Sequence, residues 1–189
     1  MTDIFSVALD LQEFFERRHW PFCIIGGVAA LHWGEPRVTR DVDVTLLAGF
    51  GAEEPFVNDL LSNYKCRISD ARAFALQNRV LLLQAPGGIG IDVALGALPF
   101  EESAVNRARK VPITETISLR LCTPEDLIVF KAFAGRDIDW RDIRGIVARQ
   151  GDSKLDWSYI ERQLTPLAEA KEQPELLELL RRIRKTAQS

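Results

Sequence analysis

The stretch GEPRVTRDVDVTLL, residues 34–47, places two aspartates inside a run that otherwise has the pattern of a buried strand. From residue 37 to residue 47 the side chains alternate between apolar and polar types, which predicts a β-strand with one buried face. Asp41 and Asp43 then point to the same side of the strand, with their Cα atoms roughly 6.5 Å apart. Two carboxylates at this spacing repel each other unless a cation lies between them, so the stretch indicates a cation site.

The composition is that of an ordinary globular protein. The chain has 189 residues, 47% hydrophobic and 27% charged, enough for one full core or for one domain with a small second lobe. A formal net charge of −3 argues against a globally basic nucleic-acid-coating protein and leaves a local basic groove open. The three cysteines are scattered and accompany only two histidines, so neither a zinc site nor a disulfide framework is indicated. The sequence shows neither an apolar run of membrane-span length nor a signal peptide, so we expect a cytoplasmic protein.

The predicted elements are mixed at first and all helical afterwards. Strands are expected over residues 21–27, 37–47, 79–84, 89–95 and 117–122, and helices over residues 4–18, 28–33, 53–63, 123–134, 138–150, 156–169 and 174–185. The Pro-Gly-rich turn APGG joins the third and fourth strands and predicts a hairpin. Thr2 is the expected cap of the first helix, and Thr123 followed by Pro124 opens the first C-terminal helix.

A third strand aspartate adds to the first two. In residues 89–95 the apolar side chains share one face, and Asp92 points to the other. Magnesium takes oxygen ligands and binds through a few carboxylates together with substrate phosphates. Asp41, Asp43 and Asp92 would together complete a site for two such ions about 3.5–4 Å apart, the arrangement that serves in-line phosphoryl displacement.

The double glycine Gly26-Gly27 closes one predicted strand and opens a short helix. Backbone N–H groups without neighbouring side chains can approach an anion closely at the positive end of a helix. A lone Asp-x-Asp is usually an exposed strand face, a lone Gly-Gly is usually a turn, and Lys131 and Arg136 taken alone are ordinary solvated helix residues. Their combination in this order favours a phosphate cradle beside a metal site, as nucleotidyl transfer requires.

These residues resemble the signature of nucleotidyltransferases of the DNA polymerase beta superfamily, in particular the AbiEii-like branch, which includes nucleotidyltransferase toxins of bacterial toxin–antitoxin pairs. The first matching block follows the Gly-Gly turn and contains Gly34, Pro36, Arg37, Thr39, Asp41 and Asp43, with Asp92 on a later strand. The second block contains Lys131, Arg136, Asp139, Asp142 and Ile143. The resemblance spans roughly residues 20–147.

The resemblance implies an α+β, polymerase-beta-like nucleotidyltransferase fold, with a small mixed sheet flanked by helices. We expect a nucleotidyltransferase core in residues 1–122 and a helical lobe in residues 123–189 that closes over the nucleotide. The implied reaction moves a nucleoside monophosphate from an NTP to an acceptor hydroxyl, releases pyrophosphate and requires Mg²⁺ or Mn²⁺. The implied partners are an NTP, RNA such as a tRNA 3′ end as acceptor, and an antitoxin protein.

The resemblance also implies roles for the site residues. Asp41 and Asp43 would be shared by both ions, and Asp92 would bind the catalytic ion and help to activate the acceptor hydroxyl. Gly26 and Gly27 would cradle the phosphates, although many superfamily members carry Gly-Ser at this turn.

Other polar residues of the two blocks have open assignments. Lys131 would neutralise the triphosphate; Arg136 either does so as well or pairs with Asp139 or Asp142. Those two aspartates would orient Lys131 or Arg136, or cap local structure. Two further residues are assigned to nucleotide binding: Thr39, which shares the face of the aspartates, and Arg37, which lies either at the mouth of the site or on the surface.

Two other functions stay open at this point. The acceptor is alternatively a small molecule or a protein hydroxyl, and the chain is alternatively a non-enzymatic nucleotide- or partner-binding module. The intact set of Asp41, Asp43 and Asp92 argues for an enzyme.

Overall fold

The computed structural model describes residues 3–187, and its contacts divide the chain into two units. The first unit holds the residues up to Val28 together with Val38–Cys122, and the second holds Ala29–Arg37 together with the chain from Thr123 onward. The expected division between residues 122 and 123 did not include the short segment 29–37 in the helical part. Strands and helices alternate in the first unit and helices alone follow from Thr123, so the α+β class is confirmed.

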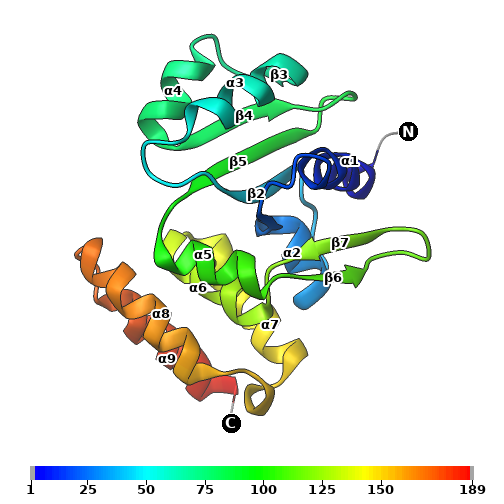
Figure 1. The fold of residues 1–189 in the computed structure, drawn as a ribbon. Coiled ribbons are helices and arrows are strands. Elements are labelled where there is room, and N and C mark those ends of the chain that lie inside the picture. Colours follow the sequence, from blue (N-terminus) through cyan, green and yellow to red (C-terminus); the bar gives the residue numbers. More distant parts are fainter. Residues whose placement is uncertain (1–2, 188–189) are drawn as a thin grey trace. The chain divides into compact units, whose positions relative to one another are not determined.

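Among the described residues, seven strands form one sheet in the first unit, in the order β3-β4-β5-β2-β1-β7-β6 (Figure 1). Their bounds are β1 Phe22–Ile24, β2 Asp41–Leu47, β3 Lys65–Cys66, β4 Val80–Gln84, β5 Gly90–Gly96, β6 Arg109–Pro112 and β7 Ser118–Leu121. β2 is parallel to β5 and β1 is parallel to β7, whereas the other neighbours are antiparallel. The sheet is therefore mixed, and the predicted hairpin of β4 and β5 is confirmed.

The predicted alternation is confirmed around the aspartates of the two central strands, but not at Thr45, which is fully buried. Val42 and Val44 of β2 and Ile91 and Val93 of β5 are buried, while the residues between them are partly exposed. The strand β2 begins at Asp41 and not at residue 37, because its neighbour β5 begins at Gly90, the register partner of Asp41. Residues 37–40 share the alternating pattern but lie outside β2, whose register with β5 starts at Asp41.

Four helices of the first unit are α1 Ile4–Glu16, α3 Glu54–Asn63, α4 Ala71–Asn78 and α5 Pro99–Arg107. Asp3 caps α1, because its carboxylate accepts from the N–H groups of Phe5 and Ser6. The predicted cap, Thr2, lies outside the described residues. The sequence analysis did not predict α4, α5, β3 or β6. The helix α2, Gly26–Trp33, starts in the first unit and continues into the second.

The second unit contains α6 Pro124–Ala134, α7 Asp137–Gln150, the 3-10 turn Asp152–Lys154, α8 Trp157–Ala170 and α9 Glu175–Ala187. α6 packs against α7, α8 and α9. Its start confirms the prediction: the Thr123 hydroxyl accepts from the N–H of Asp126 and Pro124 follows the cap. Gly135, with φ +71°, ends the helix in the left-handed conformation.

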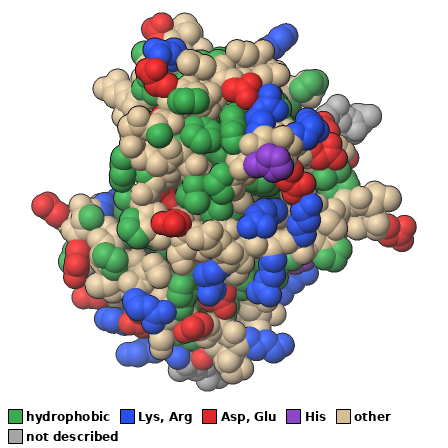
Figure 2. Space-filling view, viewed as in Figure 1, with side chains coloured by type: hydrophobic (Ala, Val, Ile, Leu, Met, Phe, Trp, Pro, Cys, Tyr) green, Lys and Arg blue, Asp and Glu red, His purple; other side chains and the backbone are tan. Residues whose placement is uncertain are grey.

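The molecular surface carries both signs of charge. On the face drawn in Figure 2, acidic and basic side chains are mixed, and neither sign covers it. Every helix within residues 3–187 is too short or too polar to cross a membrane.

Candidate functional site

The three predicted aspartates lie on one face of the sheet, within the first unit. Asp43 of β2 is the register partner of Asp92 of β5, and Asp41 is the partner of Gly90 one row away. Register partners in a parallel pair project to the same side, so β2 and β5 bring the three carboxylates together. We call Asp41, Asp43 and Asp92 the carboxylate cluster.

The carboxylate cluster is partly shielded from water. The side chains of Asp41 and Asp92 are 47% and 32% exposed. Burial raises the pKa of Asp92; Arg67 acts against this shift, and the nearby charges of Asp43 and Asp41 add to it. Because the three carboxylates influence one another, the cluster favours a counter-charge.

Arg67 provides that counter-charge in the structure. Its Nη2 forms an ion pair with Asp92, and its Nη1 lies 4.0 Å from Asp41 Oδ1. Arg67 was not predicted as a site residue, because the two-residue strand β3 that precedes it is too short for its periodicity to show which face Arg67 takes. No signal in the sequence connects it with the aspartates.

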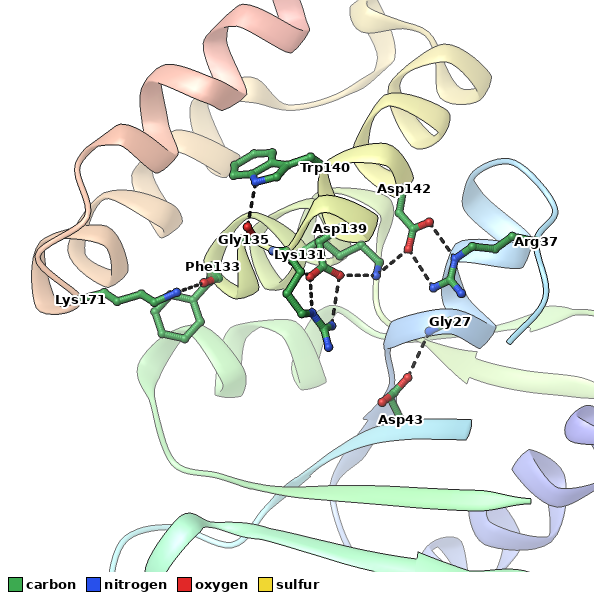
Figure 3. Close-up of polar contacts among 11 residues, drawn as sticks. Gly27, Arg37, Asp43, Lys131, Phe133, Gly135, Asp139, Trp140, Asp142 and Lys171 are labelled. Carbon is green, nitrogen blue, oxygen red and sulfur yellow. Dashed lines mark hydrogen bonds and ion pairs between the residues drawn. The ribbon is translucent and has the colours of Figure 1, made fainter. Parts of the chain in front are cut away.

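The Gly26-Gly27 turn lies directly against Asp43. Gly26 has φ +59°, and a Cβ atom there would lie 2.0 Å from Asp43 Oδ2. The Gly27 N–H donates to the same oxygen over 3.2 Å, as Figure 3 shows. Two features therefore require glycine at residue 26: the left-handed backbone conformation and the close approach of the Asp43 carboxylate.

Thr39 explains why residue 27 is glycine and not serine. A Cβ atom at residue 27 would lie 2.1 Å from Thr39 Oγ1 and 2.8 Å from Thr39 Cβ. The threonine hydroxyl thus fills the space that a serine side chain would need, and it donates to the Asp41 carbonyl over 3.4 Å. Thr39, Gly27 and Asp43 lie together, and a role of Thr39 in nucleotide binding stays a prediction.

The carboxylate cluster fits a hard divalent cation by its donor set. All three side chains offer oxygen ligands from adjacent strands, and the position beside Asp41 and Asp92 already attracts a cationic group. As the side chains stand in residues 3–187, however, no group of three or more His, Cys, Asp and Glu is arranged to hold a metal ion. The three carboxylates would therefore have to move to bind one, and the metal site stays a prediction.

Residues of the second block, together with Arg37 of the first, form a network of charges within the second unit. Arg37 binds Asp142 through two hydrogen bonds, from Nε to Oδ1 over 2.8 Å and from Nη2 to Oδ2 over 2.9 Å. The Lys131 ammonium lies between Asp142, at 2.7 Å, and Asp139, at 2.9 Å (Figure 3). Arg136 donates from Nε to Asp139 over 2.6 Å. The five residues form one chain of alternating charge, which we call the charge network of the second unit.

The side chains of this network differ widely in their exposure to solvent. The side chain of Lys131 is 5% exposed, whereas that of Arg136 is 71% exposed. Burial opposes ionisation of Asp139, but hydrogen bonds from Arg136 and Lys131 outweigh it and hold the pKa below its ordinary value. Of the open assignments, the pairing of Arg136 with Asp139 is thus observed, and phosphate binding by Lys131 or Arg136 stays a prediction.

A cavity of about 720 Å³ in the first unit lies apart from the carboxylate cluster. Val7 and Phe14 of α1 line it together with Ile91, which occupies the opposite face of β5 from Asp92. None of the three aspartates is among its lining residues.

Comparison with protein families gives one match that covers almost the whole chain. Residues 2–180 match a family described as nucleotidyltransferase of unknown function (DUF6036). Comparison with curated protein sequences finds no significant match.

Solved structures share the fold at low sequence identity. An antigenic nucleotidyltransferase-like protein from Paracoccidioides brasiliensis is 17% identical, with a TM-score of 0.54 over 94% of this chain and 91% of that one. The antibiotic-resistance factor ANT(2'')-Ia is 13% identical, with a TM-score of 0.56 over 89% and 92%. The lincosamide antibiotic adenylyltransferase LnuA, solved with lincomycin, is 13% identical, with a TM-score of 0.52 over 77% and 96%. The expected nucleotidyltransferase fold is confirmed by these neighbours.

Proposed function

The chain belongs to this nucleotidyltransferase family, and on that premise we propose that it transfers a nucleoside monophosphate from an NTP to an acceptor hydroxyl with release of pyrophosphate. The observation that carries the proposal is the register of β2 and β5. It places Asp43 beside Asp92 and Asp41 one row away, all on one face. Such a set of carboxylates suits two-metal displacement at phosphorus.

Asp41, Asp43 and Asp92 would hold the divalent cations, Mg²⁺ or Mn²⁺. When bound, such ions neutralise phosphate charge and lower the pKa of a coordinated hydroxyl. Asp92 would lie next to the acceptor hydroxyl, because β5 stands on the side of β2 away from the glycine turn.

The Gly26-Gly27 turn would receive the phosphates of the NTP. The Gly27 N–H now donates to Asp43, so a phosphate oxygen would replace that carboxylate as the acceptor. Thr39 supplies a hydroxyl directly beside Gly27 and would add a second donor to the same phosphate. Arg136 is exposed at the end of the charge network of the second unit and is the proposed contact to the triphosphate. Lys131, which is buried and shares Asp139 with Arg136, would add positive charge behind it.

The acceptor we propose is RNA, in keeping with the resemblance to the AbiEii-like, toxin-type branch. The side chains that continue the aspartate face beyond Asp92 are Leu82 and Arg67 in one row and Gln84 and Lys65 in the next. Lys65 is the cation that this face would offer to a phosphate-bearing chain, because Arg67 is already paired with Asp92 and Asp41. On the same analogy, the protein would be the toxin of a toxin–antitoxin pair, with a neighbouring protein as its antitoxin.

A label-transfer assay tests this function. The protein is incubated with Mg²⁺ and each α-labelled NTP in turn, with total RNA or total protein as acceptor, and with Asp41→Ala in parallel. Label in RNA from one preferred NTP, absent with the variant, supports the proposal. Label in protein keeps the chemistry and changes the acceptor. A folded, NTP-binding protein that labels no fraction would instead indicate a small-molecule acceptor or a non-enzymatic module.

The small-molecule alternative rests on the fold of two neighbours, the resistance factor ANT(2'')-Ia and the adenylyltransferase LnuA. Expression of the wild-type protein separates the alternatives, because arrest of growth that Asp41→Ala relieves points to a macromolecular target. Harmless expression of a protein that is active in the label assay points to a small molecule.

A further inference from the structure

Arg67 is held on the carboxylate face by its backbone. It follows β3 directly, and its N–H donates to the Leu82 carbonyl over 2.9 Å, continuing the pairing of β3 with β4. Leu82 is the register partner of Asp92, and Asp92 is the partner of Asp43. The four residues form one row across the sheet, so Arg67 reaches the carboxylates from a fixed position on the same face.

The guanidinium of Arg67 lies over a gap in the sheet surface. A Cβ atom at Gly90 would lie 2.1 Å from Asp41 Oδ1 and 3.2 Å from Arg67 Nη1. The absence of a side chain at this position leaves room for one cationic group that contacts Asp92 and approaches Asp41 to 4.0 Å. The Arg67 side chain is 31% exposed, so this pair is partly withdrawn from water.

The chemistry of this position is that of a cation site already filled by the chain itself. Three carboxylates repel one another without a counter-charge, and Arg67 is the basic residue paired with two of them. A divalent cation that binds Asp41 and Asp92 would lie close to this guanidinium, so each positive charge opposes the binding of the other. A guanidinium cannot lose its charge at ordinary pH, so it can yield to the metal only by moving away.

We propose that Arg67 is the resident counter-charge of the carboxylate cluster and competes with the divalent cation for Asp92 and Asp41. This inference rests on the proposed function, in which these carboxylates bind the metal. Arg67 is then a positioning residue: it holds the carboxylates in place in the metal-free protein and sets the metal concentration at which the site fills.

Direct titration with Mn²⁺ tests the inference, with bound ion followed by electron paramagnetic resonance. Arg67→Gln removes the charge and keeps a polar side chain. The matched control is Arg72→Gln, because Arg72 also belongs to the first unit and pairs with Glu54 over 2.9 Å, away from the cluster. We expect Arg67→Gln to bind Mn²⁺ about three- to tenfold more tightly than the wild type, since a partly exposed ion pair of this kind no longer has to be broken. Arg72→Gln should bind like the wild type.

Several outcomes overturn the inference. Unchanged or weaker Mn²⁺ binding by Arg67→Gln, with wild-type binding intact and lost in Asp43→Asn, overturns the competition alone and leaves the proposed function standing. No binding by any of the proteins overturns both the competition and the metal assignment. Circular dichroism tests whether each variant is folded. If Arg67→Gln is unfolded, the titration is repeated with Arg67→Ala.

Discussion

Asp43 on β2 and Asp92 on β5 are register partners in parallel strands, so two carboxylates face each other across a backbone pair. Like charges placed directly opposite destabilise a sheet, and the proposed metal binding would be a reason to keep them. We therefore expect Asp43→Asn and Asp92→Asn each to lower the rate of label transfer by at least about 100-fold, because a neutral amide is a poor ligand for a divalent cation.

The control for these two variants is Asp10→Asn, which removes an exposed acidic charge from α1. It should retain near wild-type activity. Equal losses in all three variants would show that net charge, and not the carboxylate cluster, governs the rate. Retained activity in Asp92→Asn alone would remove that residue from the proposed role.

Gly26 and Gly49 allow backbone strain to be separated from a steric clash. Both have positive φ, +59° and +73°, but a Cβ atom at Gly26 would strike Asp43 and one at Gly49 meets nothing within 4 Å. Each alanine substitution should destabilise the protein by roughly 1–2 kcal/mol through the left-handed backbone. Gly26→Ala should in addition displace Asp43 and lower label transfer at least about tenfold, whereas Gly49→Ala should not. Chemical unfolding and the transfer assay measure the two effects, and equal activity in both variants would contradict the argument.

The aspartate face was predictable from the sequence because strand parity is a local property. The alternation around Asp41 and Asp43, and around Asp92, identified the exposed side of two strands that lie far apart in the chain. Their adjacency in space is not local: the parallel pairing of β2 with β5 was not predicted and is a finding of the structure. The predicted turn at Gly26 was equally local, since a strand end followed by glycine carries its own signal.

The position of Arg67 and the pairing of Arg37 with Asp142 could not be predicted from the sequence, because neither follows from a local pattern. Arg67 follows a two-residue strand, which offers no period from which to read a face. Arg37 and Asp142 are 105 residues apart and their ion pair depends on tertiary packing within the second unit. Both members were noted as motif residues, but spacing in the chain could not show that they bind each other.

A substitution of Lys131 tests how much the charge network of the second unit contributes to stability. Replacing the lysine with methionine keeps the length of the side chain and leaves the buried carboxylates of Asp139 and Asp142 without their shared cation. We expect Lys131→Met to lower the free energy of unfolding by about 3–5 kcal/mol. Arg141→Ala, at an exposed position of α7, the helix that carries Asp139 and Asp142, should change it by less than about 0.5 kcal/mol.

The same variant distinguishes structural from nucleotide-binding roles of Lys131. If the variant remains as stable as the wild type but binds NTP more weakly, the lysine serves the triphosphate and not the network. A stability loss that Asp139→Asn partly restores in the double variant would instead confirm that an unpaired buried carboxylate causes it.

His32 gives the protein a pH-dependent stability near neutrality. Burial lowers the pKa of His32 from its ordinary value of 6.5, and the charge of Arg149 lowers it further. Below pH 6.5 the unfolded chain therefore takes up a proton more readily than the folded one. The contribution of His32 is fully present above that pH and is lost as the pH falls towards the folded pKa. Urea unfolding at a series of pH values should show stability decreasing on acidification in the wild type and decreasing less in His32→Gln. Identical pH profiles for the two proteins would rule out His32 as the source.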